Sequence, residues 1–348
     1  MKKILFITGL LYGASLPALA AAPGSEYWQR DAALTATRSV AVEQAAREVG
    51  DVTTLADAVS TLDRLQQLET RADWPLPARE AAVHRFTRSL ASLPRDAVAM
   101  EVMQHLLAYR ARTMVPHEEH PDAWVPLFNI RAAARGVENA WAREAATSLA
   151  VSKLLDDPVA LVDLFEQSPG GAQRHGYLDA VEIADIAAVI GVQDEVLHRL
   201  ATQPELSPLL ASTAIITRDF AAMRELLTHG HGAGLATALA RFTHDLGTDE
   251  LAGLYEFAVF EAPTPNASLA IATWWPRLRH DANTREIMLG LLGDAELGST
   301  AALALSRQPD VAIIKALSDT AAGDTQAARQ ARRALELNRA QLHAGGLQ

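Results

Sequence analysis

Residues 293–337 read GDAELGSTAALALSRQPDVAIIKALSDTAAGDTQAARQARRALEL, and this stretch contains one pattern twice. The dipeptide Gly-Asp occurs at 293–294 and again 30 residues later, at 323–324. An alanine-rich segment follows each copy, GSTAALALSR from position 298 and ARQARRALEL from position 328. Apolar residues three to four positions apart share one face of a helix. The stretch therefore predicts successive helical hairpins with closely packed alanine faces.

The same pattern extends towards the N-terminus. The segment NASLAIATWW, from Asn266, matches it at a spacing of about 32 residues. Over about residues 266–342 the chain resembles HEAT-like repeats, in which a Gly-Asp turn precedes an alanine-rich helix and a second helix completes the hairpin. The resemblance implies that small residues let neighbouring hairpins approach closely. Larger side chains are expected to fill the space between hairpins: Leu303, Leu305, Ile313, Ile314 and Leu317.

Helical spacing of apolar residues continues over the rest of the chain, with breaks rich in Pro, Gly or Asp. The pattern predicts an all-α fold, an α-solenoid of antiparallel helical hairpins over residues 51–343. No segment alternates over six or more residues, so no strand is predicted. Residues 21–50 are expected to be partly extended or irregular, and residues 344–348 to form a disordered tail. Three of the predicted helices are Ala123–Arg135, Glu138–Leu155 and Ala180–Ile190.

The N-terminus has the three parts of a cleavable signal peptide over residues 1–20. Lys2 and Lys3 precede an uncharged apolar run at 4–16, which is too short to span a bilayer. Pro17 and the small residues of Ala18-Leu19-Ala20 then predict cleavage before Ala21. The chain has no cysteine for a lipid anchor. We therefore expect a periplasmic or secreted protein that is soluble after cleavage and has no stable membrane anchor.

The composition also limits the partners. Aromatic residues make up only 5% of the chain, which suits closely packed helices better than sheets. The formal net charge is −11, and loss of the two lysines of the signal makes the mature chain more acidic still. An acidic surface repels phosphate backbones, so no nucleic acid is expected as a partner.

The motifs of enzymes are largely missing. The sequence has no Gly-x-Ser-x-Gly elbow and no phosphate-binding or dinucleotide-binding glycine pattern. The candidate metal ligands are His117 and His120 in the segment His-Glu-Glu-His. These histidines are three residues apart and lie between two prolines, whereas the metalloprotease helix needs a spacing of four. The alternative is a solvated loop, and no cofactor and no catalytic residue are predicted.

The segment from Trp274 to His280 is the candidate partner-binding surface, because tryptophan and arginine are enriched in binding hot spots. The candidate residues are Trp274, Trp275, Arg277 and Arg279. The alternative is that the tryptophans anchor the core, since one of two successive helical residues usually faces inward.

These observations favour a non-catalytic, exported helical-repeat scaffold that binds a protein or peptide partner in the cell envelope. One alternative is a metal-dependent or other hydrolase whose site is assembled between helices. A further alternative is a structural module of the cell-wall machinery.

Overall fold

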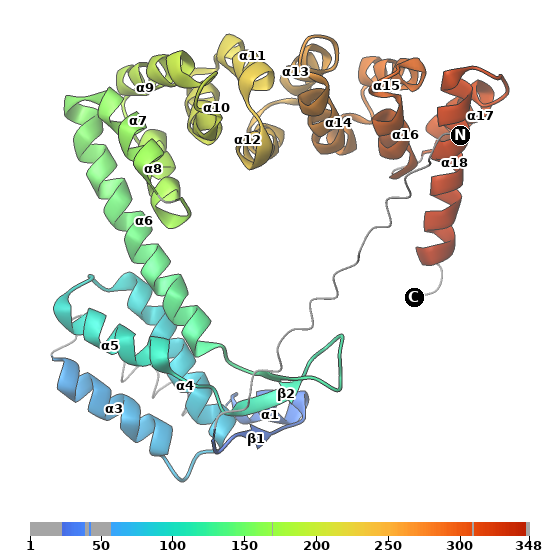
Figure 1. The fold of residues 1–348 in the computed structure, drawn as a ribbon. Helices are drawn as coiled ribbons and strands as arrows, with labels where there is room; N and C mark the ends of the chain where they lie inside the picture. Colours follow the sequence, from blue (N-terminus) through green and yellow to red (C-terminus); the bar gives the residue numbers. More distant parts are fainter. Residues whose placement is uncertain (1–22, 39–41, 43–56, 169, 308–309, 346–348) are drawn as a thin grey trace, which may run out of the picture. The chain divides into compact units, whose positions relative to one another are not determined.

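The computed structural model describes residues 23–38, 42, 57–168, 170–307 and 310–345 (Figure 1). The chain divides into two compact units, Met1–Trp141 and Ala142–Gln348, and each has its own hydrophobic core. The predicted signal peptide, residues 1–20, lies outside the described residues, as do residues 346–348 of the predicted tail.

The first unit combines helices with a small sheet. Its core is built around Phe86 and Trp141, both of which are buried. The helices of this unit are α1 (Arg30–Ala36), α3 (Ala58–Thr70), α4 (Leu76–Ser89) and α5 (Ala97–Ala108), with a 3-10 turn at Leu90–Ser92. Helix α6 (Ile130–Asp156) contains the boundary between the two units.

The sheet corrects the prediction that the chain has no strands. Strands β1 (Glu26–Tyr27), β2 (Thr113–Pro116) and β3 (Trp124–Pro126) lie in the order β1-β2-β3. β1 runs parallel to β2, and β3 runs antiparallel to it, with Val115 opposite Val125. These strands are too short to show an alternating pattern, and contacts distant in the sequence position them.

All three of the predicted helices named above have a wrong boundary, and Glu138–Leu155 begins inside α6, which runs unbroken from Ile130 to Asp156. The predicted helix Ala123–Arg135 begins too early, because β3 occupies its first turn and α6 starts only after Asn129. The side chain of Asn129 caps that start by accepting a hydrogen bond from the amide of Ala132 at 2.9 Å. The predicted helix Ala180–Ile190 is divided by a turn at residues 183–185.

The second unit is entirely helical over its described residues (Figure 1). With the first unit, it confirms the all-α prediction apart from the small sheet. Its helices are the end of α6, α7 (Pro158–Gln167), α8 (Ala172–Glu182), α9 (Ile186–Arg199), α10 (Ser207–Thr217), α11 (Phe220–His229), α12 (Gly232–Asp245), α13 (Thr248–Phe260), α14 (Thr264–Leu278), α15 (Ala282–Gly290), α16 (Gly298–Arg307), α17 (Val311–Thr320) and α18 (Gln326–Gly345), with 3-10 turns at Pro204–Leu206 and Leu291–Gly293.

Many of these helices begin at an aspartate, as the breaks in the sequence indicate. In α15 the carboxylate of Asp281 accepts a hydrogen bond from the amide of Thr284 at 2.7 Å, and this bond lowers the pKa of Asp281. In α17 Asp310 accepts in the same way from the amide of Ile313 at 2.7 Å. Each cap satisfies an amide that the first helical turn leaves without a partner.

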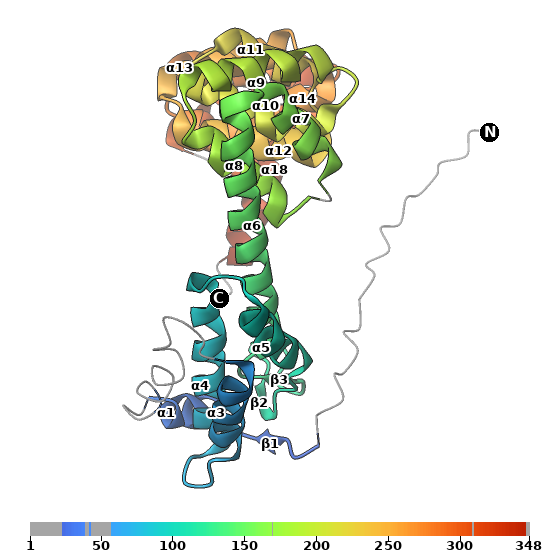
Figure 2. The same ribbon diagram turned by 90° about the vertical axis from the view of Figure 1, so that its left-hand side faces the viewer.

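Helices that alternate along the chain pack side by side. α10 contacts α12, α12 contacts α14, α14 contacts α16, and α16 contacts α18. α9, α11, α13 and α15 make a second series of neighbours. Figures 1 and 2 show these series as two layers, with the odd-numbered helices on one side and the even-numbered helices on the other. This packing is compatible with a helical-repeat fold.

Several contacts between neighbouring even-numbered helices join residues 32 positions apart. The hydroxyls of Ser268 and Thr300 lie 3.3 Å apart, and the amide nitrogen of the Asn338 side chain donates to the carbonyl of Ser306 at 3.0 Å. The alanines that coincide in the sequence alignment are all buried: Ala301, Ala304, Ala331 and Ala334. The alanine faces therefore pack as the spacing predicts.

The larger side chains follow the prediction only in part. Leu305, Ile313 and Leu317 are buried. Leu303 and Ile314 were expected between hairpins as well, but both are exposed. In each helix they lie next to a core residue in the sequence, and successive helical residues point in different directions. Among the described residues, no helix is both long and apolar enough to cross a membrane.

Candidate functional site

The main candidate site is an apolar cavity where α6, α8 and α9 meet, which we call the α9 groove. Its volume is about 430 Å³, within the range of ligand pockets. All of its lining residues belong to the second unit: Val151, Leu154, Pro158, Ala180, Ile183, Ala184, Asp185, Ala187 and Ala188.

Exposed isoleucines continue from this groove along the start of α9. Ile183, in the turn between α8 and α9, is 71% exposed, and Ile186 and Ile190 are 54% and 45% exposed. Ile186 and Ile190 are one helical turn apart and share a face. The adjacent side of the helix carries Val189 and Val192, which are fully buried. Helix α9 is therefore apolar on two sides, and only one of them is covered by the core.

Helix α7 lies against α9 beside the groove. Gly191 of α9 permits this close approach, because a Cβ atom there would lie 3.3 Å from the Cβ of Pro158. Val159, the next residue of α7, is exposed and adds to the apolar surface. The amide of Val159 donates to the carboxylate of Asp157 at 3.1 Å, which caps α7. Beside the groove, α7 therefore begins with a capped first turn.

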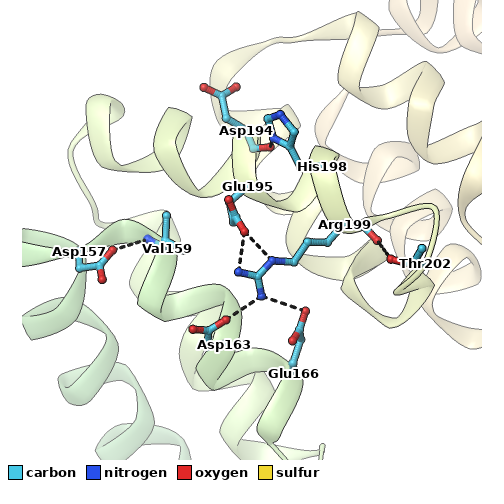
Figure 3. A network of polar contacts seen from close by, with 9 residues as sticks. All are labelled: Asp157, Val159, Asp163, Glu166, Asp194, Glu195, His198, Arg199 and Thr202. Carbon is cyan, nitrogen blue, oxygen red and sulfur yellow. Dashed lines mark hydrogen bonds and ion pairs between the residues drawn. The ribbon is translucent and has the colours of Figure 1, made fainter.

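Beyond the groove, the same two helices carry a network of charges around Arg199 (Figure 3). Its guanidinium donates to Asp163 at 2.7 Å, to Glu195 at 2.5 Å and to Glu166 at 3.4 Å. These hydrogen bonds, with that to Asp163 the strongest, raise the pKa of Arg199. Three carboxylates surround one cation, so the surface next to the groove keeps an excess of negative charge.

A second, polar cavity lies in the first unit, and we call it the His105 cavity. Its volume is about 370 Å³, and its lining includes Thr70, Arg110 and Arg112. Within it, Nε2 of His105 lies 3.2 Å from a carboxylate oxygen of Glu69. A carboxylate next to an imidazole can orient the ring by accepting a hydrogen bond from it.

Tyr109 connects the His105 cavity to a buried carboxylate. Its hydroxyl donates to Glu80 at 3.4 Å, and burial, with the charge of Glu80 as the next cause, raises the pKa of Tyr109. Glu80 is fully buried and also accepts from the backbone amides of Arg112 at 2.6 Å and Thr113 at 3.0 Å. The carboxylate therefore fixes the start of β2, which gives it a structural role.

The predicted metal ligands His117 and His120 lie in the loop between β2 and β3. Their rings are stacked with centroids 5.3 Å apart, and Nδ1 of His117 accepts from the backbone amide of His120 at 3.3 Å. Glu118 forms an ion pair with Arg30 at 3.2 Å. Among the described residues, no group of three or more potential ligand side chains could hold a metal ion. Metal binding by the two histidines stays a prediction.

The predicted partner-binding residues lie on α14 and at its C-terminus. Trp274 and Trp275 are both buried in the core, so their rings are structural anchors and are not offered to a partner. Arg277 donates to the carbonyl of Leu246 at 2.7 Å, which connects α14 to the end of α12. Arg279 donates to the ring of His280 at 3.0 Å. Arg277 thus connects two helices, and partner binding by Arg277 and Arg279 stays a prediction.

The isoleucines of the α9 groove were not predicted as a site. The sequence signal that could have found them is the excess of apolar residues in IAAVIGV, from Ile186 to Val192, which covers more than one face of a helix. The chain matches no protein-family model, and neither curated protein sequences nor solved structures show significant similarity to it.

Proposed function

We propose that this chain is a non-catalytic, exported scaffold whose second unit is an α-solenoid that binds a protein or peptide partner in the cell envelope. The observation that carries the proposal is the exposed isoleucine surface of the α9 groove, at Ile183, Ile186 and Ile190. Exposed apolar surface around a cavity costs solvation free energy, and in natural proteins such patches mark interaction sites. Export rests on the predicted signal peptide alone.

The solenoid is supported by two independent features. Neighbouring helices pack in two alternating series, and three contacts between successive hairpins share the separation of 32 residues. A regular separation means that each hairpin meets the next in the same way, which is the defining relationship of a solenoid. Solenoids bind partners along extended surfaces, and such binding needs no catalytic group.

Site-specific crosslinking in living cells tests this function. A photo-reactive residue at Ala187, which is exposed and lines the groove, is expected to capture the same envelope protein reproducibly. The matched control is Glu256, which is exposed on α13. Mass spectrometry would identify the products, and N-terminal sequencing should find a mature chain that begins at Ala21. Identical products at both positions, or none at Ala187, would contradict the proposal.

A second candidate function is a hydrolase, and the His105 cavity is the observation that favours it. The pair of His105 and Glu69 could hold a water molecule for attack on a substrate, and Arg110 and Arg112 could stabilise negative charge that develops there. A screen of ester, amide and phosphoester substrates with the purified chain tests this function. Turnover that His105→Ala abolishes would favour the hydrolase over the scaffold.

A further inference from the structure

The exposed face of α9 has acidic residues at both ends of its apolar part. Asp185 directly precedes the helix, Ile186 and Ile190 follow on one face, and Asp194 comes one turn further along that face. Asp185 and Asp194 are both exposed. The two acids are separated by about 13 Å along the helix axis, at 1.5 Å per residue.

Both carboxylates lack a partner within the described part of the chain. Asp185 occupies the N-cap position of α9, but its side chain makes no capping hydrogen bond. The side chain of Asp194 makes no hydrogen bond or ion pair among the described residues, and its backbone carbonyl lies 2.6 Å from Nδ1 of His198. Negative charge at a helix N-terminus is favourable in itself, which accounts for Asp185. Asp194 lies in the interior of α9, so the favourable charge at a helix N-terminus does not explain why its carboxylate is left without a partner.

The Arg199 network adds to this negative charge on the side of α7. Asp163 lies one turn beyond the exposed Val159, and its side chain is 51% exposed although it pairs with Arg199. Figure 3 shows Asp163 and Glu166 pointing from α7 towards the guanidinium and Asp194 on the neighbouring turn of α9. The apolar surface is thus bordered by negative charge that the single arginine does not neutralise.

On the basis of the proposed function, we infer that the occupant of the α9 groove is a peptide segment of another protein with an apolar anchor and flanking Lys or Arg residues. The anchor enters the apolar cavity and covers Ile186 and Ile190. The basic residues of the peptide pair with Asp185 and Asp194. To reach both acids, they must be about nine residues apart if the peptide is helical, or about four if it is extended. A net charge of −11 on the chain disfavours an acidic partner and accelerates association with a basic one.

Selection from a phage-displayed library of random peptides tests this inference, with peptides of about 12 residues so that a helix reaches both acids. The immobilised full chain is expected to enrich peptides that combine a large apolar residue with Lys or Arg on each side. Synthetic copies are then measured by fluorescence anisotropy. The double variant Ile186→Ser/Ile190→Ser should weaken their binding about a hundredfold, since two apolar side chains lose their contact.

Charge is tested separately from apolar contact. Asp185→Lys/Asp194→Lys should weaken binding about tenfold, with a smaller effect at high salt. Two matched controls are expected to leave affinity unchanged. Phe260→Ser/Val311→Ser removes exposed apolar residues of α13 and α17, and Glu256→Lys/Asp319→Lys makes the same change in net charge elsewhere. Thermal melts of all variants check that the fold is retained.

The possible results separate this inference from the proposed function. Peptides that need Ile186 and Ile190 but show no preference for basic residues would overturn the inference and leave partner binding at the groove intact. Failure to enrich any peptide that depends on the groove would overturn both. Self-association that Ile186→Ser/Ile190→Ser abolishes would assign the groove to a second copy of the chain, and this too would overturn both.

Discussion

The indole nitrogen of Trp274 donates a hydrogen bond to the backbone carbonyl of Leu239 at 3.0 Å, and so connects α14 to α12. The neighbouring Trp275 is equally buried, but its indole nitrogen has no partner among the described residues. The two residues therefore provide a direct comparison of a satisfied and an unsatisfied polar group in one core.

We expect Trp274→Phe to be more destabilising than Trp275→Phe. Both changes remove the same volume, but only the first breaks a buried hydrogen bond, so the free energies of unfolding should differ by about 1–2 kcal/mol. Urea unfolding followed by circular dichroism measures the difference. Equal losses in the two variants would show that the bond to Leu239 contributes nothing to stability.

Substitution by alanine should change the stability of the chain in opposite directions at two glycines of the second unit. A Cβ atom at Gly176 would clash with the backbone carbonyl of Arg143 and would lie 2.8 Å from the Cβ of Ala146, where α8 crosses α6. Gly176→Ala should lower the free energy of unfolding by about 3 kcal/mol. Gly253 lies within α13 with no atom within 4 Å of such a Cβ, so Gly253→Ala should stabilise the chain by about 0.5–1 kcal/mol. Melting temperatures that shift in the same direction would contradict this.

The buried carboxylate of Glu80 should be sensitive to a change as small as Glu80→Gln. Glutamine has a single oxygen, so it can accept from the amide of Arg112 or that of Thr113 but must turn an NH₂ group towards the other. We expect a loss of about 1–3 kcal/mol. Glu101→Gln, at an exposed position of α5, is the control and should change stability by less than about 0.5 kcal/mol. Chemical denaturation of both variants provides the measurement.

Stability should fall at alkaline pH because of Tyr255. Burial raises the pKa of its hydroxyl, whose oxygen has no partner among the described residues. The native state therefore keeps its proton at a pH where an unfolded tyrosine, with a pKa of about 10, loses it. The contribution of Tyr255 is complete below about pH 10 and is lost as the pH rises further.

The variant Tyr255→Phe separates this effect from other alkaline titrations. It should flatten the decline of stability above about pH 10, and at neutral pH it should leave stability unchanged or higher, since it removes an unsatisfied hydroxyl. Unfolding free energies measured over the alkaline range in both proteins check this. A decline of the same slope in the variant would exclude Tyr255 as its source.

The repeat at the C-terminus shows what local pattern can predict. Ala301 and Ala331 occupy equivalent positions in the sequence, and both are buried. Alanine at helical spacing identifies a close-packed face, and aspartates such as Asp310 mark helix starts, because both effects depend only on residues within one or two turns. Leu303 was wrongly predicted to be covered, because periodicity identifies apolar residues but does not show whether a neighbouring helix covers them.

The candidate sites depended on contacts that are distant in the sequence. Nothing near Arg199 indicates that Asp163 and Glu166 will reach it from α7, and nothing near Thr113 indicates that Glu80 will fix a strand there. The predicted partner residues Trp274 and Trp275 are core anchors, while the unpredicted Ile186 and Ile190 are exposed. An apolar residue has the same sequence signature in both situations.

The sequence alone therefore determined the all-α class, several helix starts and the alanine faces of the C-terminal helices, since local spacing and capping govern these features. Its prediction of an export signal stays open to test. Only the tertiary structure decided which faces are covered and which charges meet. Those outcomes depend on how helices separated by 30 or more residues pack, as Arg199 and Asp163 do at a separation of 36.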